Sequence, residues 1–462
     1  MKSKTHRITI LVTAVGILSA LGGLASNGPD SAAVSGVVTS KEEGRMEGVL
    51  ISAKSEGGTI AVTVISDSQG RYAFPSGRLK AGNYHIKIRA VGYELDDAGL
   101  VRVDADKTIQ LNLTLRKTID LASQLTDAEW LMSIPGNAEQ KLFRTTCVEC
   151  HSMQRIFQSK YDATGFLPVL QRMGFNIAVA GPEEQGSSSA PTGERFDPFR
   201  DTRPPAEELA KYLSSVNLSS SKDGKWSYEF KTFPRPTGRA ARAIITEYDL
   251  PRQECQPHDV VVDRDGMVWY GDFGNNLNAS LGRLNPQTGE VKEWQVPLLK
   301  PKASKSMLDL RLDKDGNLWM AMRMQGGIAK FDKKAEKFTT WAAPQKYNFD
   351  RMNVSMIALN PDGTVWFKDS PNLKAHRLDP KTGEIATFSM PNVFYGIESD
   401  SKGNLYMASL NSHKIGVMDA KTGKWEIYTP STPRAAPRRG DMDRLDRFWF
   451  GEFLARTTGV RL

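Results

Sequence analysis

The sequence predicts a multidomain protein that is mainly β, with a small α-helical domain between two β regions. Three observations support this fold class. Apolar and polar residues alternate with period two over residues 33–117, the periodicity becomes helical over residues 119–221, and a strand–turn–strand repeat occupies residues 243–462. A chain of 462 residues is also too long for one ordinary core, so we expect these regions to fold as separate units.

The first 25 residues have the pattern of a secretory signal peptide. A basic start, from Lys2 to Arg7, precedes an apolar run from Ile8 to about Leu24, and small residues follow up to Ala25. A retained membrane anchor is the alternative, but the run holds about 17 residues and is interrupted by glycines, which is short for a span. We therefore expect residues 1–25 to be removed, leaving a soluble periplasmic or secreted protein with no membrane span.

The charge and the cysteine content restrict the classes of molecule that we expect this protein to bind. The formal net charge is +8, but no run of Lys and Arg reaches four residues, so we expect a mixed, solvated surface and no nucleic-acid partner. The chain has only three cysteines, which excludes a disulfide-rich scaffold. Two of them share one pentapeptide, and the third, Cys255, is expected to be an ordinary, part-buried thiol.

Residues 33–117 predict a small β-sandwich, because short alternating segments are separated by Gly, Asp and Ser turns. Three stretches resemble the carboxypeptidase regulatory-like family: Ser66 to Pro75, Leu79 to Ile86, and Ala90 to Tyr93. The resemblance implies a seven-stranded, transthyretin-like sandwich that serves in adhesion or spacing. It also makes carbohydrate a candidate ligand, although no exposed aromatic platform is evident in the sequence.

Residues 119–221 predict a small α-helical domain. Thr126 is placed to cap a first helix whose first turn is acidic. A second helix over residues 162–173 has Phe166, Val169, Leu170 and Met173 on one face, and a third begins near Pro204. A loop rich in Gly, Pro and Ser, from residue 174 to 203, separates the last two helices.

The pentapeptide from Cys147 to His151, which reads Cys-Val-Glu-Cys-His, predicts one covalently bound haem c. Two thiols at this spacing can add to the two vinyl groups of haem, and the adjacent His151 can ligate the iron. Half of a zinc site would need a second ligand pair nearby, which the sequence lacks. A redox dithiol would not require the histidine, and no βαβ pattern surrounds the motif. We therefore assign Cys147, Cys150 and His151 to haem attachment.

The second axial ligand of the iron is Met173 in our interpretation. Met153 is tethered two residues from His151, so it cannot readily cross to the opposite haem face. Met132 and an open site remain alternatives, as does a core role for Met173. The segment resembles class I cytochrome c, which implies a thioether ligand, but it departs from that family in having no Met inside the loop 174–203.

Residues 243–462 carry an internal repeat that predicts a β-propeller. Each copy has an apolar strand, an Asp-Gly type of turn and a second strand with an aromatic anchor; the anchors are Trp269, Trp319, Trp366, Tyr406 and Trp449. They lie 50, 47, 40 and 43 residues apart, and a second hairpin completes each full unit. Four strands in every 40 to 50 residues are typical of propeller blades.

These repeats resemble the virginiamycin B lyase (streptogramin lyase) family. The resemblance implies a seven-bladed propeller, whereas the sequence holds four complete units and a fifth that stops after Trp449 without its second hairpin. We therefore predict an incomplete, C-terminally truncated β-propeller. Because unpaired strand edges seek another chain, we expect self-association through the open edge.

The same resemblance implies a magnesium-assisted elimination that uses a His in a Pro-His pair, a second His and a Glu. Pro257 and His258 match the pair in the first repeat, but the equivalent positions of His258 in the later repeats are Leu308, Ser355, Tyr395 and Arg438. His258 is therefore a weak catalytic candidate, with a hydrogen-bonded structural role as the alternative. We do not expect streptogramin-ring opening.

Two Asp-x-Asp-Gly turns raise the question of calcium binding. They contain Asp263 and Asp265, and Asp313 and Asp315. The full 12-residue calcium loop with its distal Glu is absent, so we expect hairpin turns without a metal.

Together these features predict an exported c-type cytochrome for electron transfer. Its redox partner would be a protein or a small-molecule electron donor, and the sandwich and propeller would serve as recognition scaffolds. The rival hypothesis is a periplasmic oxidoreductase or lyase with its active site in the propeller channel and the haem as an electron relay. Only His258 and Asp259 offer acid–base groups for that site in the sequence.

Overall fold

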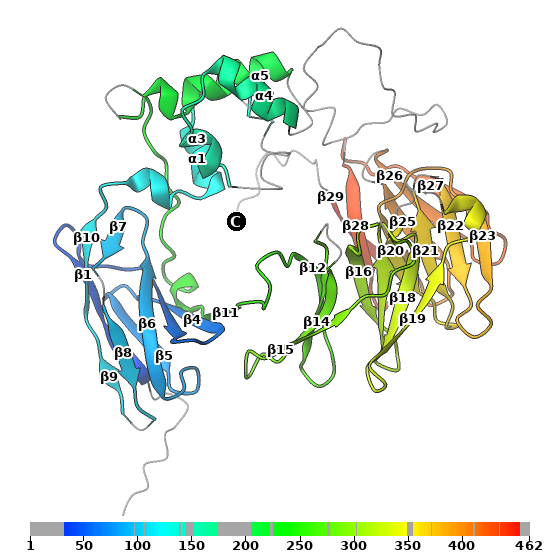
Figure 1. Ribbon diagram of the computed structural model, residues 1–462, viewed down its shortest axis with the longest axis horizontal. Helices are drawn as coiled ribbons and strands as arrows, with labels where there is room; N and C mark the ends of the chain where they lie inside the picture. The colour runs from blue at the N-terminus through cyan, green and yellow to red at the C-terminus, as the bar shows by residue number, and fades with distance from the viewer. Residues whose placement is uncertain are drawn as a thin grey trace, which may run out of the picture.

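The computed structural model describes residues 32–452 except for 97, 106, 138–139, 142, 144–151, 173–204, 222–224, 275–277, 302, 349–353, 371, 410–411 and 434. The predicted signal peptide, Cys147, Cys150, His151 and Met173 therefore lie outside the described residues. Figure 1 shows a β-sandwich on one side, an array of small sheets on the other, and a group of helices beside them. The fold is mainly β, as predicted.

The N-terminal β region is a sandwich of two sheets around one apolar core. One sheet contains β1 (Ala32–Ser40), β2 (Gly44–Arg45), β5 (Arg71–Pro75), β7 (Tyr93–Leu95), β9 (Ile109–Gln110) and β10 (Leu113–Lys117). The other contains β3 (Leu50–Ser55), β4 (Ile60–Ile65), β6 (Gly82–Arg89), β8 (Leu100–Val103) and β11 (Ile245–Tyr248). Tyr72 and Phe74 of β5 are buried while Arg71 and Ala73 are exposed, which confirms the period of two.

Strand β11 comes from the part of the chain that the sequence had placed at the start of the propeller. Its four residues pair antiparallel with Ile60 to Thr63 of β4, although they lie about 180 residues later in the chain (Figure 1). The pairing satisfies N–H and C=O groups along an edge of β4 that would otherwise be open. The sheets have six and five strands rather than the seven in total that the family resemblance implied, because β11 and short edge strands add to them.

The helical region has an apolar core of its own. Its elements are η1 (Leu121–Gln124), α1 (Asp127–Ser133), α3 (Gln154–Phe157), α4 (Ala163–Arg172), α5 (Ala206–Val216) and η2 (Leu218–Ser220). The predicted cap of α1 is confirmed, because the Thr126 hydroxyl accepts a hydrogen bond from the Glu129 amide and the Glu129 carboxylate accepts one from the Thr126 amide. Phe166 and Leu170 bury the predicted face of α4 against α5.

After a short turn, η3 (Ala240–Arg242), and β11, residues 257–452 form successive antiparallel sheets with strands in chain order. The first is β12 (Pro257–Val262), β13 (Val268–Asp272), β14 (Ser280–Leu284) and β15 (Val291–Gln295). The second is β16 (Met307–Leu312), β17 (Leu318–Met322), β18 (Gly327–Asp332) and β19 (Lys337–Ala342). The third, after η4 (Gln345–Tyr347), is β20 (Val354–Leu359), β21 (Val365–Asp369), β22 (Lys374–Leu378) and β23 (Ile385–Ser389). The fourth is β24 (Gly396–Ser399), β25 (Leu405–Ser409), β26 (Lys414–Met418) and β27 (Trp425–Tyr428), and β28 (Pro437–Met442) pairs with β29 (Phe448–Glu452).

The first strands of consecutive sheets contact one another, from β12 through β16, β20 and β24 to β28. We call them the inner strands, and we call the end of the array at which they begin the entry end. Inner strands that contact their neighbours in sequence order are typical of a propeller, so the sheets have a propeller-like arrangement. Four four-stranded sheets and one two-stranded sheet among the described residues match the predicted repeat units.

In three of the five repeat units a turn Asp explains why an aromatic anchor follows six residues later. In the third unit Asn360 takes this position, and the indole nitrogen of Trp366 has no partner among the described residues. The Asp263 carboxylate accepts hydrogen bonds from the amides of Asp265 and Met267 at 3.0 Å and from the indole nitrogen of Trp269 at 2.8 Å. Asp313 and Asp443 hold the indoles of Trp319 and Trp449 at 3.1 and 2.9 Å. These carboxylates close hairpin turns, as predicted, and their oxygens are occupied by N–H donors rather than arranged for a cation.

The last described sheet leaves an edge open. Among the described residues β29 pairs only with β28, and Trp449 and Leu445 are 61% and 71% exposed. A groove of about 630 Å³ lies between this hairpin and the fourth sheet, with Tyr406, Phe448 and Phe450 in its lining. The exposed aromatic residues and the open edge are therefore adjacent.

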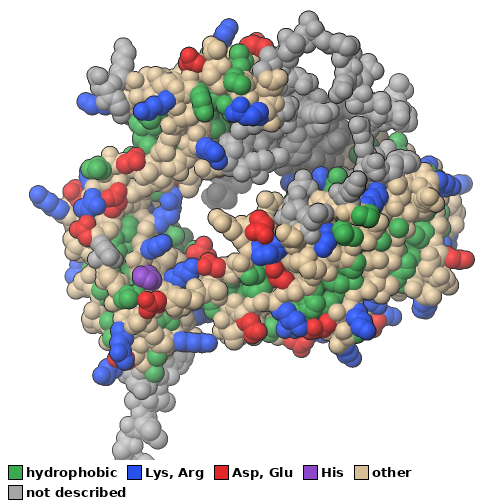
Figure 2. All heavy atoms as spheres, viewed as in Figure 1, with side chains coloured by type: hydrophobic (Ala, Val, Ile, Leu, Met, Phe, Trp, Pro, Cys, Tyr) green, Lys and Arg blue, Asp and Glu red, His purple; other side chains and the backbone are tan. Residues whose placement is uncertain are grey.

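The surface of the described residues carries both signs of charge. On the face seen in Figure 2, basic and acidic side chains are interspersed over the sandwich and the sheets. Within the described ranges no helix is long and apolar enough to cross a membrane.

Candidate functional site

The predicted haem site can be approached through the residues that bracket it. Cys147, Cys150, His151 and Met173 are not among the described residues. Phe143 and Met153, on either side of the motif, are both fully buried in the helical core. The Met153 amide donates to a carboxylate oxygen of Asp127 at 2.6 Å, which ties the chain after the motif to the start of α1.

Trp130 of α1 is the centre of this core. Its ring is fully buried and packs at 5.1 to 5.3 Å from Phe157, Trp226 and Phe230. Its indole N–H is buried but has no hydrogen-bond partner among the described residues. An unsatisfied buried donor costs about 1–3 kcal/mol, so an acceptor is expected there. Haem carries two propionate carboxylates, which could accept this N–H. The thiols and the imidazole of the motif also fit haem, because they are the groups that attach it and ligate its iron.

Of the two candidate thioether ligands, the structure describes Met132 but not Met173. Met132 lies on α1 and is half-buried. Met173 directly follows Arg172, the last residue of α4, and lies outside the described residues. Met153 is part of the aromatic core and not a surface group.

His258 stands at the entry end of β12. Its Nδ1 lies 2.7 Å from a carboxylate oxygen of Asp259, and its ring packs at 5.0 Å on Phe273. Arg439 of β28 donates to the other Asp259 oxygen at 2.6 Å. Burial alone would raise the pKa of Asp259, but His258 and Arg439 lower it, so the carboxylate stays ionised and orients the imidazole.

A second polar cluster on the inner strands was missed by the sequence reasoning. Arg311 of β16 lies 3.2 Å from Asp309 on the same strand and 2.5 Å from Glu398 on β24. Asp309 also accepts the Ile357 amide of β20 at 2.9 Å, so three inner strands are linked. The sequence feature that could have revealed this cluster is a pair of charged residues, Asp309 and Arg311, that interrupts an otherwise apolar strand.

Burial perturbs the acid–base groups of this cluster. It raises the pKa of Glu398 to about 7, although Arg311 opposes the change. It lowers the pKa of the fully buried Lys368 to about 7, although Asp309 and Asp369 oppose it, and the amine donates to Ser355 at 2.6 Å. Groups that titrate near neutral pH in one region can exchange protons, which is a property of catalytic sites and of structural ion-pair networks alike.

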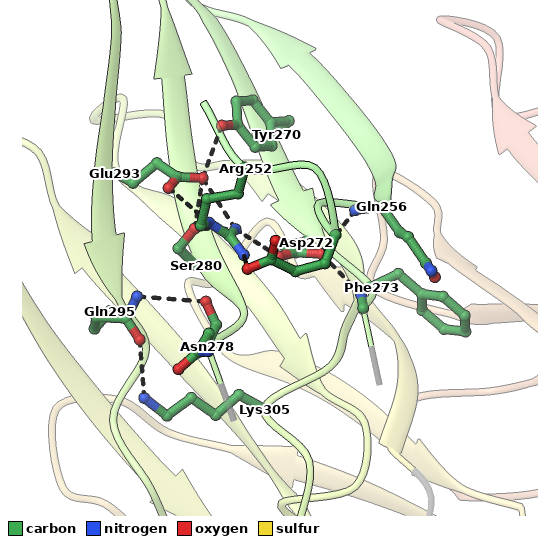
Figure 3. Close-up of polar contacts among 12 residues, drawn as sticks. Arg252, Gln256, Tyr270, Asp272, Phe273, Asn278, Ser280, Glu293, Gln295 and Lys305 are labelled. Atoms are coloured by element: carbon green, nitrogen blue, oxygen red, sulfur yellow. Dashed lines mark hydrogen bonds and ion pairs between the residues drawn. The ribbon is translucent and has the colours of Figure 1, made fainter. Parts of the chain in front are cut away.

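A third network lies on the face of the first sheet opposite its apolar core (Figure 3). Arg252 donates to Asp272 at 2.6 Å and to Glu293 at 2.8 Å, and Glu293 also accepts hydrogen bonds from Tyr270 and Ser280. Asp272 is fully buried. The network fixes the segment before β12 onto the sheet, and nothing in the sequence pattern singled out Arg252.

Cys255 lies beside this network. It is a free, part-buried cysteine, as predicted. Burial and the nearby Asp272 carboxylate raise the pKa of its thiol to about 11, so it is an unreactive thiol at neutral pH. Across the described residues no group of three or more His, Cys, Asp or Glu side chains is arranged to hold a metal ion.

Comparison with known proteins gives a family match for the N-terminal region and structural neighbours of low similarity. Residues 33–116 match the family model of the carboxypeptidase regulatory-like domain. Virginiamycin B lyase from Staphylococcus aureus is structurally similar at 22% identity with a TM-score of 0.39, over 46% of this chain and 68% of that protein. A gluconolactonase from Xanthomonas campestris is similar at 16% identity and a TM-score of 0.33, over 42% and 69%.

An extracellular domain of a putative one-component system from B. thetaiotaomicron is similar at 16% identity with a TM-score of 0.34, over 44% of this chain and 27% of that protein. No curated protein sequence matches the chain significantly. These similarities assign no activity to the chain.

Proposed function

We propose that this protein is an exported c-type cytochrome that carries one covalent haem and transfers electrons. The observation that carries the proposal is the pentapeptide from Cys147 to His151, bracketed by a buried core in which the Trp130 N–H has no acceptor among the described residues. Cys147 and Cys150 would form the two thioether bonds. His151 and Met173 would ligate the iron, and residues 1–25 would direct export.

Bound haem would supply a one-electron redox step. The chain contributes the surroundings: the aromatic core around Trp130 and Phe157 excludes water from one side of the helical region. Burial of this kind sets the polarity around a redox centre and so tunes its potential. The Trp130 N–H would donate a hydrogen bond to an acceptor on the haem.

The β regions would act as recognition scaffolds for a redox protein or a small-molecule electron donor. In this proposal the edge of β29 that is unpaired among the described residues allows self-association. The sandwich is a spacing module, with carbohydrate as a candidate ligand.

A second candidate function is an oxidoreductase or lyase whose active site lies on the inner strands. It is favoured by the His258–Asp259 pair and by Glu398 and Lys368, whose pKa values burial brings to about 7. In that case a substrate bound near the entry end would be oxidised or cleaved there. Electrons from an oxidation would pass to the haem, which would relay them. Addition of substrates should then change the haem spectrum in wild type but not in His258→Ala.

The main proposal is tested by producing the full chain in an export-competent host that has haem-attachment machinery. We expect a coloured protein that keeps its haem through acid–acetone extraction and denaturing electrophoresis. His151→Ala should lose the low-spin spectrum, and Cys147→Ser with Cys150→Ser should lose covalent attachment. Cys255→Ser is the matched control and should keep both. A colourless wild-type product under these conditions would overturn the proposal.

A further inference from the structure

Arg323, at the entry end of the sheets, is a cation for which the described residues supply no counter-charge. It directly follows β17, and its guanidinium lies 5.0 Å from the centre of the Phe273 ring. Its Nε is buried without a hydrogen-bond partner, and no ion pair to Arg323 exists within the described part of the chain. Burial lowers the pKa of this guanidinium, which is the mark of a charge in a desolvated place.

Hydrogen bonds fix the backbone of Arg323, whereas its buried Nε has no hydrogen-bond partner among the described residues. The Arg323 amide donates to Ser306 at 3.0 Å, and its carbonyl accepts the Val354 amide at 3.1 Å. These bonds fix the residue between the second and third sheets. Contact with Phe273 stabilises a guanidinium but does not neutralise it. A half-buried arginine that keeps its charge is costly unless an anion pairs with it.

Further cations surround the same place through Tyr395, which directly precedes β24. Arg438 and Arg439 of β28 lie 5.2 and 5.9 Å from the centre of the Tyr395 ring, and the Lys368 amine lies at 5.9 Å. Arg323 itself interacts electrostatically with Tyr395. Cations and two aromatic rings therefore meet at one end of the array, where β13 and β17 end and where β24 and β28 begin.

The described carboxylates at this end of the sheets are paired with other cations. Asp259 is shared between His258 and Arg439, and Asp309 is paired with Arg311 deeper on the inner strands. Neither carboxylate contacts Arg323. Among the described residues the Arg323 guanidinium is therefore not paired with a carboxylate, and it lies near the rings of Phe273 and Tyr395.

We propose that the entry end binds a small organic carboxylate, with Arg323 as its charged anchor and the rings of Phe273 and Tyr395 against its apolar part. A guanidinium presents two parallel N–H groups that match the two oxygens of a carboxylate. The planar guanidinium fork matches the two coplanar oxygens of a carboxylate, which favours a carboxylate over a phosphate at this anchor. This inference goes beyond electron transfer and does not depend on the haem.

The test is calorimetric titration of the full-length holoprotein with benzoate, with the uncharged isostere benzamide and with inorganic phosphate. We expect benzoate to bind at least about tenfold more tightly than benzamide, because only the carboxylate pairs with a charge. Arg323→Gln should weaken benzoate by about tenfold or more, and Arg323→Lys, which keeps the charge but not the fork, should fall between. Arg264→Gln, at an exposed arginine of the first sheet, should bind like wild type.

Equal affinity for benzoate and benzamide, or unchanged benzoate binding by Arg323→Gln, would overturn the proposal. Tighter binding of phosphate than of benzoate would also overturn it and assign the site to phosphate. If Arg323→Gln fails to fold, the comparison of benzoate with benzamide in wild type and Arg323→Lys decides the question. Haem content is read from the absorbance of the same samples, so a protein that lacks haem but binds benzoate separates the two proposals.

Discussion

The Arg252 network allows the sharpest prediction about stability. Replacing Arg252 with Met keeps much of the apolar stem but leaves Asp272 and Glu293 without their counter-charge (Figure 3). Removing one partner of a buried ion pair costs about 3–5 kcal/mol, because the remaining charge stays desolvated. Arg252 and Glu293 are 18% and 16% exposed, so water relieves part of that cost. We expect a loss of about 2–4 kcal/mol in the free energy of unfolding of the sheets.

The loss should depend on pH. Burial alone would raise the pKa of Glu293, but hydrogen bonds from Arg252, Ser280 and Tyr270 lower it. A lowered pKa means that Glu293 contributes stability above its unfolded-state pKa, and that this contribution is lost as the pH falls through the folded-state pKa. Without Arg252 the pKa of Glu293 rises instead. The difference between wild type and Arg252→Met should therefore shrink below about pH 4.5.

Thermal unfolding followed by near-ultraviolet circular dichroism measures the effect. For a unit of about 200 residues the expected loss lowers Tm by about 6–12 °C at neutral pH. Arg264→Met is the matched control, since Arg264 is exposed on the hairpin of the same sheet, and its Tm should stay close to that of wild type. The double variant with Glu293→Gln should recover at least about 1 kcal/mol relative to additivity. A Tm for Arg252→Met equal to that of Arg264→Met, or strict additivity, would refute the reasoning.

Three further outcomes are expected. If Met173 ligates the iron, Met173→Ala should abolish the weak charge-transfer band of a thioether-ligated ferric haem and Met153→Leu should keep it; a wild-type protein without that band, which binds cyanide readily, would rule Met173 out. Because burial raises the pKa of Glu398 to about 7, wild-type stability should fall as the pH rises from about 4.5 to 7, by at most about 3 kcal/mol, and Glu398→Gln should flatten this slope; an unchanged slope would contradict the assignment. The open edge of β29 should cause self-association or protease sensitivity beyond about Pro433, so a protease-resistant monomer in light scattering would show that the edge is closed in another way.

The repeated sheets could be predicted because the same short sequence pattern, a turn followed by an aromatic anchor, recurs in each unit. The Asp263 turn and the Trp269 anchor recur as Asp313 with Trp319. Periodicity of this kind is visible in one sequence, since every copy gives the same signal again. The cap at Thr126 was equally predictable, because it depends on residues only three positions apart.

The polar networks could not be predicted, because their members are far apart in the chain and occur once. Arg252 meets Glu293 41 residues later. Arg311 and Glu398 stand at the same repeat position, before the anchors Trp319 and Tyr406, but the residue type there changes from unit to unit, so the repeat does not predict that these two pair. Single long-range pairs leave no periodic trace, so only the inner-strand charges in an apolar pattern hinted that such contacts exist.

The largest departure from the sequence interpretation, strand β11, changes how the three regions relate. The segment that leaves the helical region first contacts α1, where the Phe233 amide donates to Glu129 at 3.0 Å. It next pairs Arg235 with Glu43 of the sandwich, and then forms β11 against β4.

From there the chain connects the sandwich to the first of the small sheets. Tyr248 donates its hydroxyl to the Pro286 carbonyl at 2.8 Å, and Thr59 of the sandwich donates to the Gly289 carbonyl at 3.2 Å. One segment thus covers the open edge of β4 and contacts all three regions. Because a strand pairing of several backbone hydrogen bonds resists separation better than a free linker does, this segment links the helical region and the sheets through the sandwich. The sandwich is therefore the part that orients the proposed haem relative to the entry end, which gives a spacing role a physical basis.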